Sequence, residues 1–158
     1  MTSYYFDSSA LVKRYAWEVG TEWVQRITDP ASGHILLVSR ITGAEITAAI
    51  WRKVREGNLS HKDALRIAGD FRHHFYSQYH IVEVSADIVE EAMNLIARHG
   101  LRGYDGVQLA SAKLVDHRRQ IANLPSLIFV SADTALLDAA KAEGLEIANP
   151  VNSRLPPD

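Results

Sequence analysis

Cysteine is absent from all 158 residues of the chain. This absence excludes a disulfide framework, a thiolate metal site and a cysteine nucleophile, and it is compatible with a reducing compartment. The fold must therefore depend on an ordinary hydrophobic core, for which 47% hydrophobic residues over this length are sufficient. Any metal site must use oxygen or nitrogen ligands.

Long apolar runs are missing as well. No stretch approaches the roughly 20 residues that a helix needs to cross a bilayer. Residues 1–9 (MTSYYFDSS) lack the basic region and the apolar region of a signal peptide. We expect a soluble, cytoplasmic protein with no membrane partner.

The chain also has little excess charge of either sign. Its formal net charge is -2 and its isoelectric point is about 6.4, so it lacks the basic surface typical of proteins that bind nucleic acid through overall charge. Any such binding must be local. Residues 40–79 carry more basic than acidic side chains, which fits either a track for phosphates or an ordinary solvated helix surface. The candidate substrate contacts are Arg52, Lys53, Arg102, Tyr104 and Lys113.

What the chain does contain is a regular alternation of strand-like and helix-like segments. This alternation predicts an α/β fold, with a mostly parallel central sheet of about five strands covered by helices on both faces. The expected strands are 3–6, 34–39, 80–85, 126–133 and 145–149. The expected helices are 8–16, 20–28, 42–56, 60–79, 86–100, 104–123 and 134–144. We expect one domain, residues 1–150, and a short C-terminal tail, residues 151–158.

Four acidic residues stand at comparable places in this pattern. Asp7 and Asp133 follow the first and fourth strands, Glu45 lies in the first turn of the helix after the second strand, and Asp105 opens a helix. Because ligands of open parallel sheets bind beyond the carboxyl ends of the strands, the four carboxylates could converge on one pocket.

A purely structural interpretation stands beside this one. Each aspartate could be the N-cap of its helix, and Thr42 and Glu45 in the sequence TGAE match a capping box. The joint occurrence of four acids favours a pocket. Oxygen-only ligands suit Mg²⁺ or Mn²⁺, and such ions support phosphodiester hydrolysis.

Four segments, in order, make the chain resemble the PIN-domain ribonucleases, and among them the VapC-type toxins of prokaryotic toxin–antitoxin pairs. The segments are YYFDSSALVKRY, TGAEITAAIWR, LRGYDGVQLASA and LIFVSADTALLDAAKAEGL. The resemblance covers essentially the whole chain and implies a PIN-like three-layer sandwich. The one small departure is Gly106, where alanine is commoner, and we expect it to loosen the start of its helix.

The resemblance implies that Asp7, Glu45, Asp105 and Asp133 are the catalytic and metal-binding acids of a metal-dependent ribonuclease. Asp7, Asp105 and Asp133 would bind Mg²⁺ or Mn²⁺, and Glu45 would hold metal through water or position the attacking water. Ser9 and Ser131 match the accessory hydroxyl positions. The resemblance also implies an RNA substrate cut to leave a 5′-phosphate and a 3′-hydroxyl, an antitoxin that covers the acidic pocket, and a homodimer.

Two other functions remain open at this point. A phosphohydrolase could use Asp7 as a nucleophile, but the dehalogenase-like enzymes carry a second aspartate two residues later, where this chain has Ser9. A non-catalytic PIN-like module could bind RNA or a protein without needing four acids. A zinc hydrolase is disfavoured because the seven histidines form no HxxxH pair.

Overall fold

The computed structural model describes residues 1–154; the end of the expected tail, residues 155–158, lies outside the described residues. Its centre is a five-stranded sheet in the order β3-β2-β1-β4-β5, and every neighbouring pair of strands is parallel. The strands are β1 (Ser3–Phe6), β2 (Ile35–Ser39), β3 (His80–Val82), β4 (Ile128–Val130) and β5 (Glu146–Ala148). The expected α/β fold with a parallel sheet of five strands is confirmed.

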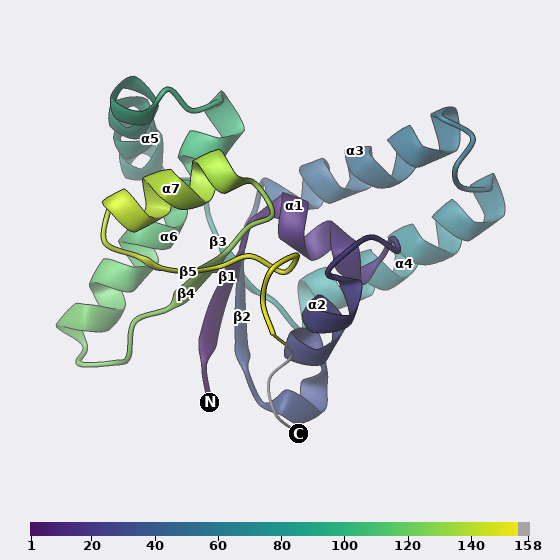
Figure 1. The fold of residues 1–158 in the computed structure, drawn as a ribbon, viewed down its shortest axis with the longest axis horizontal. Helices are drawn as coiled ribbons and strands as arrows, with labels where there is room; N and C mark the ends of the chain where they lie inside the picture. The colour runs from purple at the N-terminus through teal and green to yellow at the C-terminus, as the bar shows by residue number, and fades with distance from the viewer. Residues whose placement is uncertain (155–158) are drawn as a thin grey trace.

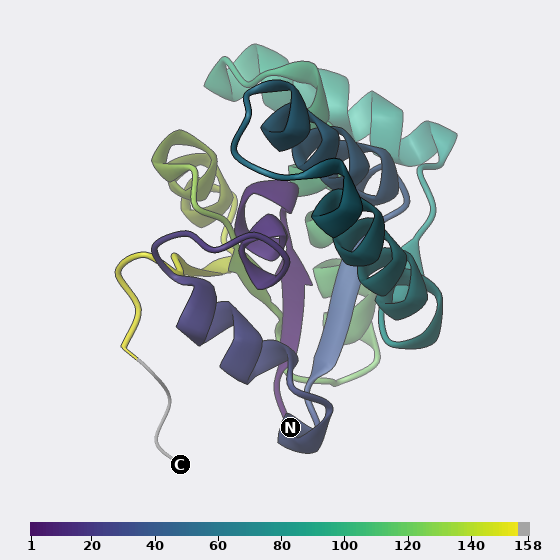
Figure 2. The same ribbon diagram turned by 90° about the vertical axis from the view of Figure 1, so that its right-hand side faces the viewer.

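Helices cover both faces of this sheet (Figures 1 and 2). One face is covered by α1 (Ser8–Leu11), α2 (Thr21–Thr28), α3 (Thr42–Arg55) and α4 (His61–Ser77). The other face is covered by α5 (Ala86–His99), α6 (Gly103–Ile121) and α7 (Thr134–Ala142). Short 3-10 turns, Val12–Arg14 and Pro30–Ser32, flank α2. Among the described residues, no helix is both long and apolar enough to cross a membrane.

Two hydrophobic cores form because β1 is central and its side chains alternate between the faces. Tyr4 and Phe6 pack into the core beneath α2, α3 and α4. Tyr5 packs on the opposite face against α5, α6 and α7. A strand buried on both faces explains why the segment SYYF has no alternation of polar and apolar residues.

The expected ends of several elements are wrong by a few residues. The helix expected over 8–16 is an α-helix only as far as Leu11, after which a 3-10 turn follows. The strand expected over 126–133 is limited to Ile128–Val130. Beyond it, the backbone N–H of Asp133 donates to the Ser131 hydroxyl at 3.0 Å and the chain turns into α7. Polar side chains at this edge compete with the strand for backbone hydrogen bonds.

Two glycines mark places where the chain packs closely. Gly20 has φ +96°, and a Cβ there would lie 2.9 Å from the carbonyl carbon and oxygen of Pro150. A Cβ on Gly106 would lie 2.5 Å from Cγ1 of Ile96 on α5. Gly106 therefore has a role that the sequence did not indicate, because its missing side chain allows α5 to pack against α6.

Candidate active site

A hollow of about 790 Å³ lies at the carboxyl edge of the sheet and is lined by all four predicted acids, Asp7, Glu45, Asp105 and Asp133. Asp7 directly follows β1, and Asp133 follows β4 by three residues. Glu45 and Asp105 lie in the first turns of α3 and α6. Because the strands are parallel, these separate segments end at one edge of the sheet and bring four carboxylates into one hollow.

Asp7 is the most buried of the four acids, with 4% of its surface exposed. It occupies the N-cap position of α1, but its side chain makes no capping hydrogen bond. Instead, Oδ2 accepts from the hydroxyls of Ser9 at 2.6 Å and Ser131 at 2.9 Å. Burial raises the pKa of Asp7, and these two hydrogen bonds oppose the rise. The interpretation of Asp7 as a simple cap is therefore wrong.

Ser9 and Ser131, the predicted accessory residues, also join the two loops that carry Asp7 and Asp133. The Ser9 hydroxyl accepts from the backbone N–H of Ala132 at 3.1 Å. The two hydroxyl oxygens lie 3.2 Å apart. Ser9 lines the hollow, whereas Ser131 is fully buried. Together they hold the Asp7 carboxylate in one orientation.

Glu45 does not belong to a capping box. The helix α3 has Ile41 at its N-cap position, with no side-chain capping hydrogen bond, and Thr42 already lies inside the helix. Oε1 of Glu45 accepts instead from the Ser8 hydroxyl at 2.9 Å and from Nε2 of Gln108 at 2.8 Å. Burial raises the pKa of Glu45, and the negative charge of Asp7 raises it further. The capping-box interpretation of the TGAE sequence is therefore wrong.

Asp133 is a true N-cap, since Oδ1 accepts from the backbone N–H groups of Ala135 at 2.9 Å and Leu136 at 3.2 Å. Asp105 is not a cap, because Arg102 occupies that position of α6. Burial raises the pKa of Asp105 to about 6, and the charges of the three other acids add to the rise while Arg102 opposes it. The four carboxylates therefore interact electrostatically.

The acids suit a hard divalent cation by their chemistry, because every side-chain donor is an oxygen. In the present arrangement, however, residues 1–154 contain no group of three or more His, Cys, Asp or Glu side chains spaced to hold a metal ion. A cation would have to draw the carboxylates closer together. Burial and, after it, repulsion from the other acids raise the pKa of Asp105, and a cation would relieve the repulsion.

Basic side chains form the rim of the same hollow. The predicted contacts Arg52, Lys53, Arg102 and Tyr104 all line it, as do Lys13 and Glu18. Glu18 accepts from Nζ of Lys13 at 2.9 Å and forms an ion pair with Nζ of Lys53 at 3.4 Å.

Lys13 was missed from the sequence, although its position six residues after Asp7 was a usable signal. Lys113 was predicted wrongly. Its Nζ binds Glu91 at 2.8 Å and Glu143 at 2.9 Å, and it does not line the hollow.

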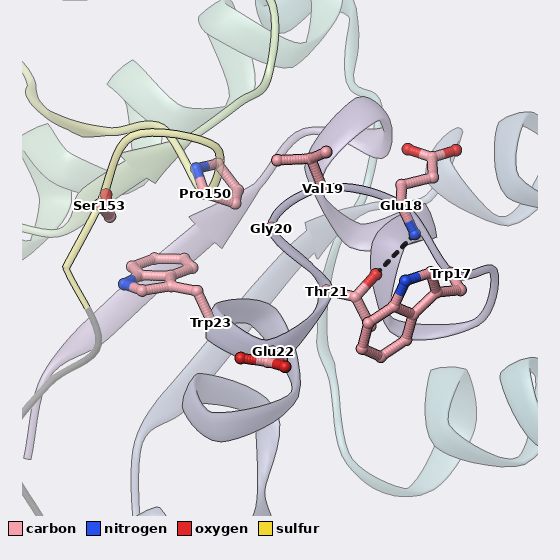
Figure 3. A pocket seen from close by; sticks show the side chains of 9 residues that line it. All are labelled: Trp17, Glu18, Val19, Gly20, Thr21, Glu22, Trp23, Pro150 and Ser153. Carbon is pink, nitrogen blue, oxygen red and sulfur yellow. Dashed lines mark hydrogen bonds between the residues drawn. The ribbon is translucent and has the colours of Figure 1, made fainter.

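A second hollow, of about 340 Å³, lies between the loop that precedes α2 and the segment after β5 (Figure 3). Trp17, Val19, Gly20, Trp23 and Pro150 line most of it. Its acidic residues are Glu18 and Glu22, and none of the four predicted acids lies there. Glu18 lines both hollows, so the two adjoin at this residue.

The sequence model of the PIN domain matches residues 4–142, and the chain belongs to this family. A curated relative, Ribonuclease VapC49 of Mycobacterium tuberculosis (strain ATCC 25618 / H37Rv), is 31% identical over 144 residues, which is 91% of this chain and 93% of the relative. The crystal structure of PAE2754 from Pyrobaculum aerophilum matches with a TM-score of 0.63 and 21% identity, over 94% of this chain and 84% of the other. A toxin–antitoxin complex from Klebsiella pneumoniae matches with a TM-score of 0.59 and 19% identity, over 92% and 96% of the two chains.

Proposed function

We propose that this protein is a metal-dependent ribonuclease, and the toxin of a toxin–antitoxin pair, that hydrolyses RNA phosphodiester bonds in the acid-lined hollow. The observation that carries the proposal is the convergence of Asp7, Glu45, Asp105 and Asp133, from four separate segments, on one hollow. The raised pKa of Asp105, about 6, is what burial beside three other carboxylates produces. The relative named Ribonuclease VapC49 supports RNA as the substrate.

The proposed cofactor is Mg²⁺ or Mn²⁺, held by Asp7, Asp105 and Asp133. When bound, such a cation lowers the pKa of water and offsets the charge of a phosphate. Glu45 would hold the cation through water or position the attacking water. Ser9 and Ser131 would keep Oδ2 of Asp7 oriented, because both hydroxyls already donate to it.

The rim side chains are proposed to hold RNA. Arg52, Lys53 and Arg102 offer positive charge to phosphates, and Tyr104 offers a ring, 60% exposed, on which a base can stack. Lys13 joins this group. Because Glu18 neutralises part of the charge of Lys13 and Lys53, a phosphate that binds there must compete with a carboxylate already in place.

An antitoxin partner is proposed on two grounds. A structural neighbour from Klebsiella pneumoniae is described as a toxin–antitoxin complex. An acid-lined hollow is also a natural receptor for an arginine or lysine of a partner. We place residues 1–150 in one PIN-like domain that acts in the cytoplasm, and a homodimer stays a prediction that light scattering would check.

The direct test uses purified wild-type protein, free of partner, with a mixed RNA pool in Mg²⁺, in Mn²⁺ or in EDTA. We expect cleavage with either cation, none in EDTA, and products with 5′-phosphate and 3′-hydroxyl ends. Cleavage that survives EDTA, or 2′,3′-cyclic phosphate ends, would contradict the metal mechanism. RNA binding without cleavage in any buffer would favour a non-catalytic module.

A further inference from the structure

Gln108 lies beneath the acid-lined hollow and was not among the residues that the sequence indicated. It is in α6, three residues after Asp105, and it is fully buried. We propose that Gln108 is a positioning residue that holds the Glu45 carboxylate in its working orientation. This inference depends on the proposed ribonuclease function, because it concerns the same site.

The side-chain amide of Gln108 makes a hydrogen bond from each end. Its Nε2 donates to Oε1 of Glu45 at 2.8 Å and also lies 3.0 Å from the Thr42 hydroxyl and 3.3 Å from the Ser8 hydroxyl. Its Oε1 accepts from the hydroxyl of Tyr5 at 3.0 Å. The result is a buried hydrogen-bond chain from the central strand β1, through α6, to Glu45 on α3.

Chemistry leaves only one orientation for this amide. A carboxylate accepts hydrogen bonds and donates none, so the nitrogen end of Gln108 must face Glu45. The carbonyl end then faces Tyr5, whose hydroxyl must donate to it. Tyr5 is itself fully buried and stacks on Phe129 at 5.8 Å between ring centroids. The Tyr5 end of this series of hydrogen bonds is therefore held firmly.

The hydrogen bonds also distinguish the two oxygens of Glu45. Both protein donors, Ser8 and Gln108, bind Oε1. Within residues 1–154, no hydrogen bond joins a protein donor to Oε2. Oε1 is therefore the anchored oxygen, and Oε2 is the one left for water or substrate in the hollow. Without Gln108, the Ser8 hydroxyl alone would hold the carboxylate.

The groups that contact the Gln108 amide are polar: Glu45, Thr42, Ser8 and Tyr5. An apolar residue of similar size would take a hydrogen-bond partner away from the buried Thr42 and Tyr5 hydroxyls, so replacing Gln108 should also lower stability. A buried amide is tolerated here because Glu45, Thr42 and Tyr5 satisfy it.

The test measures kcat and KM for a defined RNA with the variants Gln108→Met and Gln108→Glu. The first removes the donor and keeps the length; the second places a carboxylate against Glu45. We expect kcat to fall about 10- to 100-fold in Gln108→Met, as is typical when a residue supporting an active-site ligand is lost. KM should change little, because the rim residues are untouched. Gln108→Glu should be at least as impaired.

Gln120→Met is the matched control. Gln120 is on the same helix and also donates its Nε2 to a carboxylate at 2.8 Å, but that carboxylate, Asp116, is not one of the four acids of the hollow. It should keep wild-type kcat. The double variant Tyr5→Phe with Gln108→Met guards against simple unfolding, because it removes the Tyr5 hydroxyl that would otherwise lose its acceptor, although the Thr42 hydroxyl still loses its donor. It should regain part of the melting temperature that Gln108→Met loses, but not the kcat.

Combination with Glu45→Gln decides whether Gln108 acts through Glu45. If it does, adding Gln108→Met to Glu45→Gln should reduce kcat by less than about 3-fold, since coupled residues are not additive. If the fold-reductions in kcat of the two single variants multiply in the double variant, this inference is overturned. Wild-type kcat in Gln108→Met would overturn it as well. Either result would leave the ribonuclease proposal standing. A wild-type protein that does not cleave RNA would overturn the proposed function, and this inference with it.

Discussion

At the scale of single residues, Asp7 shows how a helix-start aspartate can have a role other than capping. It is at an N-cap position, yet its carboxylate accepts from the hydroxyls of Ser9 in α1 and Ser131 after β4, and it is almost completely buried. Burial raises its pKa, so the charged form is held at a cost in the absence of a cation.

Asp7→Asn should therefore separate function from stability. Asparagine keeps an acceptor for Ser9 and Ser131 but removes the buried charge, so in EDTA the melting temperature should be unchanged or higher. RNA cleavage should be almost completely lost. Asp29→Asn is the control, because Asp29 caps the exposed 3-10 turn Pro30–Ser32 and does not line the hollow. Wild-type cleavage by Asp7→Asn would place the nuclease site elsewhere.

Asp105 gives a prediction about pH. Its pKa is about 6 in the folded protein against an ordinary 3.8, so between these values the folded state binds a proton that the unfolded state does not. The contribution of Asp105 to the free energy of unfolding should therefore fall as pH rises from about 4 to about 6, and it should be lost above pH 6. Asp105→Asn should make the fall shallower.

Urea unfolding in EDTA at pH 4, 5, 6 and 7 would measure this effect, with Asp29→Asn again as the control. Excess Mg²⁺ should also make the fall of the free energy of unfolding with pH shallower. A bound cation offsets the negative charges that, together with burial, raise the pKa of Asp105. A slope that is equal in wild type and Asp105→Asn would show that Asp105 does not share the electrostatic field of the other acids.

At the scale of elements, Gly20 controls how the start of α2 meets the segment after β5. It has a positive φ, and backbone atoms of Pro150 occupy the space that a side chain would need (Figure 3). Gly20→Ala should therefore lower the free energy of unfolding by about 2 kcal/mol or more, through backbone strain and steric overlap together.

Gly57→Ala is the matched control. Gly57 also has a positive φ, +77°, but a Cβ there would meet nothing within 4 Å. Gly57→Ala should lower the free energy of unfolding only through backbone strain, by about 1 kcal/mol. Chemical denaturation of both variants measures the difference, and equal losses would mean that the approach to Pro150 contributes nothing.

At the scale of the whole molecule, a chain with a net charge of -2 separates its charges locally. Carboxylates gather inside one hollow, Arg52, Lys53 and Arg102 lie at its rim, and the buried Lys13 also lines it. The overall charge conceals this arrangement, because the acidic and basic side chains of the hollow cancel in the sum. Composition alone is therefore a poor guide to whether such a protein binds RNA.

The order of strands and helices was predictable from the sequence, because local hydrophobic patterns largely determine it. So were the four acids, since each stands next to the end of a strand or the start of a helix. The capping-box interpretation of Glu45 failed because Ser8 and Gln108, 37 and 63 residues away in sequence, take its carboxylate. The choice of Lys113 failed because Glu91 and Glu143 bind it on α5 and just after α7.

The sequence by itself determined the α/β class, the order of the elements and which carboxylates stand at the edge of the sheet, because these depend on residue type and local spacing. Only the tertiary structure decided that Asp133 is a cap and Asp7 is not, that Gly106 permits a helix contact, and that Gln108 holds Glu45. The physical reason is that a side chain's partners and its burial come from segments brought together by the sheet, and hydrogen-bond competition among them has no signature in local sequence.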